Sequence, residues 1–341
     1  MIRLQTSLPV CSVFLALVFV LGNWSSAEEV HIYLFGGQSN GTGRGDAVEI
    51  PNASPLGQVQ TDVRFWYRKT ETNATNNVLP ENEIIDLAPG AGHGTVGEVA
   101  PVEFGPELGI GRALADGLPG QNVMIIKGTH AGSNLFYGWS AGGPRYECFQ
   151  QTVGGAIDAI VANGDTPVMK GMFWVQGESD STDLGRAMDY ADNLADLVAR
   201  VRMEFLNGQD APFVLSQLSD NQFDPLGDGQ IFVREGQAAV AAADAKVKMI
   251  VTDDDFLFTT RTDIVHFDAN GLINLGTRMG QAMVELETLG DVNCDGIINL
   301  LDIEPFINLL ATAQYSAKAD LNQDGVVSLL DAGPFVELLT N

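Results

Sequence analysis

A serine in a glycine-rich turn is the first residue of the chain whose position points to chemistry. Ser39 lies in the sequence Gly-Gly-Gln-Ser-Asn over residues 36–40, directly after the apolar run 30–35. Such a run indicates a strand, and the turn after it presents a side chain at the strand's end. A serine hydroxyl is a weak nucleophile and needs a base that a third group orients. The sequence must therefore also supply a histidine paired with an acid.

One of the four histidines has an acidic residue at a useful spacing. Asp263 precedes His266 by three residues, so that one turn carries both side chains. The carboxylate would then hold one ring nitrogen while the other faces Ser39. The alternative is a solvated aspartate followed by a histidine at the start of a helix. The remaining histidines fit this arrangement poorly or not at all: His31, His93 and His130.

Two further glycine turns also follow apolar runs. Gln176 follows the run 168–175, and Gly132 follows the run 122–127. Acyl transfer places negative charge on a carbonyl oxygen, which amide N–H groups stabilise. Each turn alone is weak evidence, but their common position at strand ends predicts that both donors lie near Ser39.

Apolar runs and helical patterns alternate along most of the chain, which predicts a parallel sheet with helices on both faces. Ligands of such a sheet bind beyond the carboxyl ends of the strands, where Ser39, Gly132 and Gln176 all fall. The expected strands are 30–35, 122–127, 168–175, 213–216 and 247–252, and the expected helices are 106–116, 153–163, 184–206, 232–243 and 268–287.

The four motifs, GQSN, an AGS-type turn, QGESD and DIVHF, resemble in this order the SGNH hydrolases. More narrowly they resemble the carbohydrate esterases of the sialate O-acetylesterase and acetylxylan esterase group, of the family 6 type. The resemblance covers about residues 30–287 and includes the sequence FGPEL over residues 104–108. It implies a flavodoxin-like three-layer α/β/α fold.

The resemblance also implies roles for individual residues. Ser39 would be the nucleophile, His266 the base and Asp263 the orienting acid. The N–H of Ser39 would form the oxyanion hole together with Gly132 and Gln176. The wider superfamily usually has asparagine where this subgroup has Gln176. Two further acids match the subgroup's pattern, and either a structural role in holding the loop of Gln176 or a catalytic role is open for them: Glu178 and Asp180.

A competing interpretation comes from the nucleophile elbow of the α/β-hydrolases, since residues 37–41 also fit the pattern G-x-S-x-G. In that fold the serine follows a central strand deep in the sequence, after a loop that builds the oxyanion hole. Ser39 instead follows the first strand expected in the mature chain. The elbow is therefore the weaker interpretation.

The N-terminus predicts export. Arg3 precedes an apolar stretch over 13–21, and the small residues 25–27 form a cleavage site, so that residues 1–27 are typical of a signal peptide. The formal net charge of −26 disfavours nucleic acid and anionic membranes as partners. We expect an extracellular, cell-surface or periplasmic protein. Cys148 and Cys294 would remain in the mature chain, either as two free thiols or as one bridge.

Two segments near these motifs have open interpretations. Residues 68–103 are rich in Asn, Gly and Pro and are too long for an ordinary connection, which indicates a lid, a substrate-binding loop or a flexible insertion. Three aromatic residues follow Gly132 closely and would either stack on a sugar ring or pack in the core: Phe136, Tyr137 and Trp139.

The C-terminus contains one twelve-residue pattern twice, with a shift of 29 residues. Oxygen ligands at positions 1, 3, 5, 9 and 12, a backbone carbonyl at 7 and glycine at 6 are typical of a calcium loop. The alternative is a pair of solvated acidic turns. The predicted ligands are Asp291, Asn293, Asp295, Ile297, Asn299 and Asp302 in the first loop, and Asp320, Asn322, Asp324, Val326, Ser328 and Asp331 in the second.

This pair of loops resembles a small helical dockerin type I module over residues 290–341, which implies two structural Ca²⁺ sites and a cohesin-like scaffold or cell-surface partner. Two features differ from the common pattern. Positions 10 and 11 hold leucine pairs, at 300–301 and 329–330, instead of polar pairs. Pro305 and Pro334 are expected to interrupt the early turns of the helices that follow.

These observations predict a secreted serine esterase, with its catalytic domain over residues 28–289, that removes O-acetyl groups from carbohydrate without a catalytic metal. Acetylated polysaccharides and sialic acid are the substrate classes expected. Two other functions are open: an SGNH lipase or thioesterase that acts on longer acyl chains, and a non-catalytic carbohydrate-binding or scaffold protein. The presence of Ser39, Asp263 and His266 together favours the esterase.

Overall fold

The computed structural model describes residues 27–51, 54–67, 82–90, 102–206, 208, 211–222, 227–254 and 256–340. The expected signal peptide, apart from Ala27, lies outside these residues, and so does most of the expected insertion 68–103. No helix within the described ranges has both the length and the apolar character that crossing a membrane requires.

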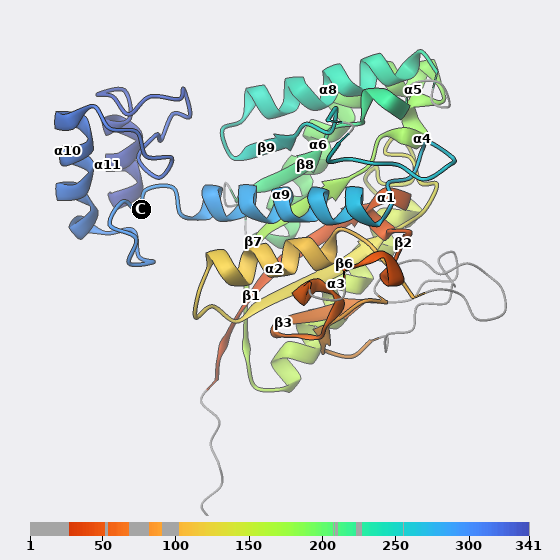
Figure 1. Cartoon of the computed structure of the whole chain (residues 1–341), viewed down its shortest axis with the longest axis horizontal. Helices are drawn as coiled ribbons and strands as arrows, with labels where there is room; N and C mark the ends of the chain where they lie inside the picture. The colour runs from red at the N-terminus through yellow and green to blue at the C-terminus, as the bar shows by residue number, and fades with distance from the viewer. Residues whose placement is uncertain are drawn as a thin grey trace, which may run out of the picture.

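The central sheet has seven strands: β1 (Glu29–Gly37), β3 (Gln60–Tyr67), β4 (Ile85–Leu87), β6 (Val123–Thr129), β7 (Thr166–Val175), β8 (Phe213–Ser216) and β9 (Val247–Ile250). Their order is β4-β3-β6-β1-β7-β8-β9 (Figure 1). All neighbours run parallel except β4, which pairs antiparallel with β3 at one edge. Five of the parallel strands, β6-β1-β7-β8-β9, follow the 2-1-3-4-5 order of a flavodoxin-like sheet, and β3 adds a further parallel strand beside β6.

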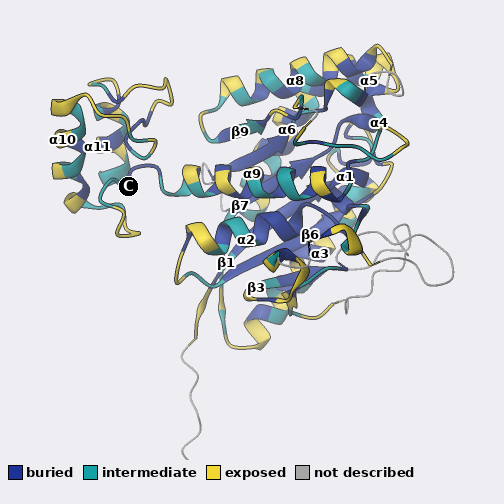
Figure 2. Cartoon of the chain, viewed as in Figure 1, coloured by how far each residue is buried: buried dark blue, intermediate teal, exposed yellow. Residues whose placement is uncertain are grey.

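Helices cover both faces of this sheet. Strand β1 shows why, because Ile32 and Leu34 pack into one apolar cluster while Tyr33 and Phe35 pack into the other. A strand buried on both faces reads as one continuous apolar run, which is the pattern the sequence shows. One face is covered by α3 (Pro144–Ala162), α6 (Tyr190–Phe205) and α8 (Gly229–Ala243). The other face is covered by α2 (Glu107–Gly117) and α9 (Ala269–Glu287). Figure 2 shows the buried strands among these helices.

The predicted three-layer α/β/α fold is thus confirmed, with differences in detail. Strand β3 was not predicted, because its first residues are polar and partly exposed and the apolar pattern begins only at Val63. Helix α3 begins at Pro144, nine residues before the predicted start, with proline in its first turn. The helix predicted over 184–206 is interrupted at Asp189 and forms α5 (Leu184–Met188) and α6.

Short elements complete the part of the chain before the C-terminal module. Part of the expected insertion 68–103 supplies β4 to the sheet edge and β5 (Glu103–Phe104), which pairs with β2 (Gly45–Asp46) in a separate two-stranded sheet. The 3₁₀ helices among the described residues of this part are η1 (Ala47–Glu49), η2 (Pro55–Gly57) and η3 (Asp220–Gln222).

The C-terminal module lies beyond the C-terminal end of α9, whereas α1 (Ser39–Thr42) and α4 (Glu178–Ser181) lie near the other end of that helix (Figure 1). Its helices η4 (Leu300–Asp302), α10 (Ile303–Thr312) and α11 (Ala332–Thr340) enclose a small core of their own. Phe306 and Phe335, which are equivalent in the sequence repeat, stack in that core with ring centroids 4.3 Å apart.

The expectation that prolines interrupt these helices was wrong. Helix α10 begins at Ile303 and α11 at Ala332, so that Pro305 and Pro334 both lie in the first turn. The N–H groups of a first turn have no partner within the helix, and the missing N–H of proline therefore costs nothing there.

Candidate active site

Three of the predicted turns meet at one edge of the sheet. The last residue of β1, Gly37, pairs with the last residues of both neighbours, β6 and β7. The turns that carry Ser39, Gly132 and Gln176 therefore leave the sheet side by side. This edge lies where the strand order reverses, which is the ligand-binding position of doubly wound sheets.

The turn into Ser39 requires glycine at Gly37. Its φ is +139°, and a Cβ atom placed there would lie 2.1 Å from the carbonyl oxygen of Val175. The chain then turns into α1, whose first residue is Ser39. The N–H of Ser39 has no hydrogen-bond acceptor within the described chain, as expected for the first residue of a helix.

A second free N–H comes from the turn after β6. Gly132 has a φ of +67°, and the space around it is open. Its N–H has no acceptor among the residues that the structure describes. The backbone donors of Ser39 and Gly132 are thus both available to an oxygen atom that binds at this edge.

The side chain of Gln176 does not offer the free donor that the sequence predicted. Its Nε2 lies 3.0 Å from Gln38 Oε1, 3.2 Å from the carbonyl oxygen of Ser133 and 2.5 Å from Asp180 Oδ2. Its Oε1 accepts from the hydroxyl of Tyr190 at 3.0 Å, which fixes the orientation of the amide. Three acceptors already face the two hydrogens of this amide, so that neither hydrogen stays free. The amide instead links its own turn to Gln38 in the turn after β1 and to Ser133 in the turn after β6.

Asp180 lies beside Gln176 and binds the backbone of a neighbouring loop. It is fully buried, and its carboxylate accepts the N–H of Leu135 at 2.8 Å and that of Phe136 at 3.1 Å. Burial raises its pKa, although these donors act in the opposite direction. Asp180 therefore holds the loop that follows Gly132.

The predicted acid and base form a pair in the loop after β9. His266 Nδ1 lies 2.9 Å from Asp263 Oδ2. The other carboxylate oxygen accepts the N–H groups of Val265 and His266 at 3.0 and 2.9 Å. Burial alone would raise the pKa of Asp263, but these donors lower it below its ordinary value. Ile264, which directly follows Asp263, has a φ of +51°, a strained conformation for a β-branched residue.

Asn40, which follows the serine, connects α1 to this loop. Its Nδ2 donates to the carbonyl oxygen of Val265 at 3.0 Å, and its Oδ1 accepts the N–H of Phe267 at 2.9 Å. The two bonds flank His266 on either side. Ser39 and His266 are both described, and no hydrogen bond joins them directly; catalytic hydrogen bonds are often long before substrate binds. The GQSN motif contains Asn40 but could not predict its contacts, because both partners lie more than 220 positions away in the chain.

Glu178 lies at the start of α4 and is buried beside Asn40. Its Oε1 accepts from Asn40 Nδ2 at 2.5 Å. Its Oε2 is buried and has no hydrogen-bond partner within the described part of the chain. Burial is the main cause that raises the pKa of Glu178.

The other histidines have different surroundings. His130 is buried beside Trp139, and burial lowers its pKa to about 4, so that its ring is neutral at pH 7. His31 lies in β1, before the strand's carboxyl end, with Nδ1 2.6 Å from Gln121 Oε1. His93 is outside the described residues.

The three aromatic residues after Gly132 separate into two groups. Trp139 is fully buried and donates to the hydroxyl of Ser133 at 2.8 Å, so it belongs to the core. Phe136 and Tyr137 are 47% and 66% exposed and remain candidates for contact with a ligand.

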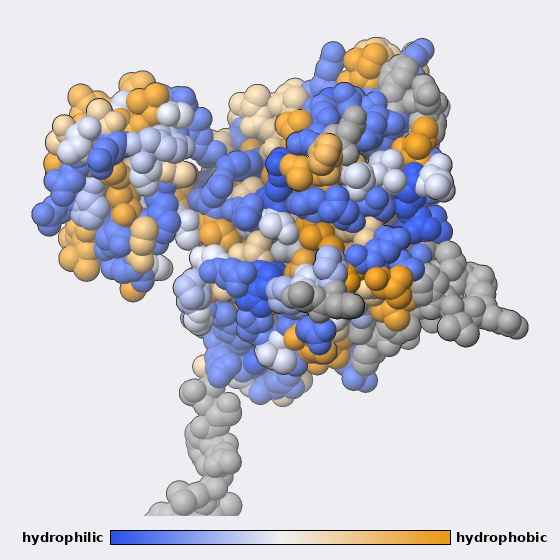
Figure 3. Space-filling view, in the orientation of Figure 1, coloured by the Kyte–Doolittle hydropathy of each residue, from blue (hydrophilic) through white to orange (hydrophobic). Residues whose placement is uncertain are grey.

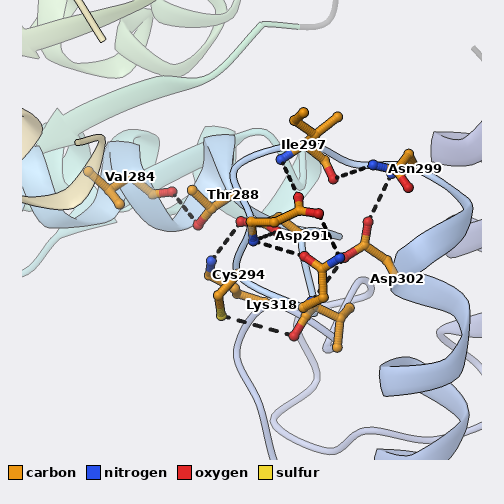
Figure 4. A network of polar contacts seen from close by, with 11 residues as sticks. Val284, Thr288, Asp291, Cys294, Ile297, Asn299, Asp302 and Lys318 are labelled. Atoms are coloured by element: carbon orange, nitrogen blue, oxygen red, sulfur yellow. Dashed lines mark hydrogen bonds and ion pairs between the residues drawn. The ribbon is translucent and has the colours of Figure 1, made fainter. Parts of the chain in front are cut away.

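The two predicted calcium loops have matching geometry. In the first loop Asp302 is fully buried, and its two oxygens accept the N–H groups of Asn293 and Asn299 at 2.9 and 2.8 Å (Figure 4). In the second loop Asp331 makes the same two bonds to Asn322 and Ser328, at 3.0 and 2.8 Å. In both copies the carboxylate at position 12 thus accepts the backbone N–H groups of positions 3 and 9.

The donor chemistry of these loops fits a hard cation, because every predicted ligand is an oxygen. The described residues contain no group of three or more His, Cys, Asp or Glu side chains placed to hold a metal by themselves. The loops would instead combine carboxylates with amide, hydroxyl and backbone oxygens. Asp291, at position 1, also accepts from Lys318 Nζ at 2.9 Å (Figure 4).

Solved structures with the same architecture include a protein from Arabidopsis thaliana, with a TM-score of 0.56 and 20% identity, which covers 74% of this chain and 97% of that one. NanS is similar with a TM-score of 0.58 and 14% identity, over 76% of this chain and 97% of that one. At these identities the likeness shows the fold alone. A search of curated proteins found no match.

Two family models match the sequence. Residues 29–285 match the carbohydrate esterases described as sialic acid-specific acetylesterases, and residues 289–333 match the dockerin type I domain. The first match covers most of the chain and includes all the motifs that meet at the sheet edge. The chain therefore belongs to the sialic acid-specific acetylesterase family of carbohydrate esterases and carries a dockerin type I domain behind its esterase domain.

Proposed function

We propose that this protein is a secreted serine esterase that releases acetate from O-acetylated carbohydrate, with Ser39 as nucleophile, His266 as base and Asp263 as orienting acid. The observation that carries the proposal is the position of His266. Its Nδ1 is held by Asp263, and the residues on either side of it are bonded to Asn40, next to Ser39.

In the proposed first step, His266 Nε2 takes the proton of the Ser39 hydroxyl while the serine oxygen bonds to the acetyl carbonyl carbon. The free N–H groups of Ser39 and Gly132 stabilise the negative carbonyl oxygen. The bond to the sugar oxygen then breaks, and that oxygen receives the proton from His266. Water repeats these steps on the acetyl-serine and releases acetate.

Acetyl specificity is tested by a series of aryl esters with acyl chains of increasing length. We expect kcat/KM to be highest for acetate and to fall by at least tenfold at hexanoate, together with acetate release from acetylated sialic acid or an acetylated polysaccharide. A maximum at long chains would favour the lipase or thioesterase alternative. Binding of these sugars without any ester hydrolysis would favour the non-catalytic alternative.

The C-terminal module supports a proposal about location. Dockerin type I domains imply a cohesin-type partner, and the leucine pairs at positions 10 and 11 are well exposed, from 68% for Leu301 to 82% for Leu329. Figure 3 shows hydrophobic residues on the surface of this module. We propose a leader over 1–27, an esterase domain over 28–289 and a calcium-dependent tether over 290–341, which holds the enzyme at a scaffold or cell surface.

Calcium binding is the prediction for this module. Titration of the metal-free protein with Ca²⁺ should give two binding events, since each loop supplies a full set of oxygen ligands. Asp302→Ala should remove one event and Asp331→Ala the other, while aryl acetate hydrolysis stays unchanged in both. No heat and no rise in the module's melting temperature on adding Ca²⁺ would contradict the two sites.

A further inference from the structure

The catalytic base that we propose comes from a distant part of the sheet. His266 lies in the loop after β9, and two strands, β7 and β8, separate β9 from β1. The sheet itself therefore does not fix the distance from this loop to Ser39. Side-chain contacts must do so, and Asn40 supplies two of them on the serine side.

The carboxamide of Asn40 works only in one orientation. Its oxygen faces the N–H of Phe267, and its nitrogen faces the carbonyl oxygen of Val265. A flip by 180° would place a donor against a donor and an acceptor against an acceptor. The second hydrogen of Nδ2 points to Glu178 Oε1, so this carboxyl group adds a third interaction that only the observed orientation satisfies.

The surroundings of Glu178 need an explanation, because it is a buried group with one unsatisfied oxygen. The residue is 4% exposed, and Oε2 has no hydrogen-bond partner among the residues that the structure describes. A buried carboxyl group with half of its bonds unmade destabilises a fold, so such groups usually have a function. Among the described residues, Asn40 is the one residue that donates a hydrogen bond to the Glu178 carboxyl group.

We propose that Asn40 and Glu178 are positioning residues, with Asn40 holding the His266 loop against the Ser39 turn and Glu178 fixing the orientation of Asn40. This inference rests on the serine mechanism proposed above. Neither residue needs to touch the acetyl group. The pair connects the segments after β1, β7 and β9, so that nucleophile and base keep one geometry.

The test compares four variants on an aryl acetate. Asn40→Ala should lower kcat about 100-fold with KM changed less than about threefold, because misalignment by about 1 Å affects the chemical step. Glu178→Leu, which removes the acceptor, should lower kcat about tenfold, as expected for one lost hydrogen bond. Glu178→Gln keeps an acceptor for Asn40 and should stay within about threefold of the wild type. Ser181→Ala is the matched control, since its buried hydroxyl bonds to the backbone of Glu178 and makes no hydrogen bond to Asn40 in the described structure.

Several outcomes would overturn the inference. Unchanged kcat in both Asn40→Ala and Glu178→Leu would do so, and so would a Glu178→Gln variant as slow as Glu178→Leu, which would assign the effect to charge. Melting temperatures are measured for all variants; if Asn40→Ala does not fold, the two Glu178 variants decide. A wild-type protein that hydrolyses no ester would instead contradict the proposed function.

Discussion

Ser39→Ala is expected to lower kcat for aryl acetate hydrolysis by at least about 10⁴-fold, because removal of a nucleophile abolishes the acyl-enzyme route. The substitution should change the free energy of unfolding by no more than about 0.5 kcal/mol, since the Ser39 hydroxyl makes no hydrogen bond in the described structure. Steady-state kinetics and thermal unfolding of the purified variant measure the two effects.

The matched control is Ser179→Ala, a serine on α4 close to the same edge. Its backbone N–H bonds to Gln38 Oε1, and its hydroxyl makes no hydrogen bond in the described structure. This variant should keep full activity. Retention of more than about a tenth of the wild-type rate in Ser39→Ala would remove that serine from the proposed mechanism.

Asp263→Asn is expected to lower kcat and kcat/KM together by about 10³-fold to 10⁴-fold. The new amide would still accept the N–H groups of Val265 and His266, so that the turn should survive. Its NH₂ group, however, would face His266 Nδ1 and favour the tautomer with the proton on Nε2. In that tautomer the nitrogen that should face Ser39 cannot act as a base.

Asp254→Asn is the control in the same loop. Asp254 Oδ1 accepts a backbone N–H two residues later, as Asp263 does. This side chain is exposed, however, and bonds to no histidine that the structure describes. We expect wild-type kinetics from it. The pKa of Asp263 lies below its ordinary value of 3.8, so this carboxylate is ionised at neutral pH and can accept from His266 Nδ1. Full activity in Asp263→Asn would disprove the orienting role.

The five strands predicted from the sequence were found because parallel strands buried on both faces form short apolar runs. Strand β3 was missed because it lies next to the edge and begins with partly exposed polar residues. The prolines of the module were misjudged for another reason. Their effect depends on the position within the helix, and the helix start was not known in advance.

The surroundings of Gln176 likewise could not be predicted from its motif. The motif gave an amide at the correct strand end, but it contained no information on which acceptors would surround that amide. In the fold, Asp180, Gln38 and the backbone of Ser133 take up both hydrogens. The importance of Asn40 and Glu178 depends likewise on partners more than 130 positions away in the chain.

The sequence alone determined the alternation of strands and helices, the positions of the reactive side chains after strands, and the repeated oxygen pattern of the module. These features are local, because strand periodicity, a three-residue turn and a calcium loop are each complete within about a dozen residues. The tertiary structure decided which amides keep a free N–H and how the His266 loop is held against Asn40, next to Ser39. Hydrogen bonds between turns far apart in the chain settle both points, and such bonds exist only once the sheet has brought its strand ends together.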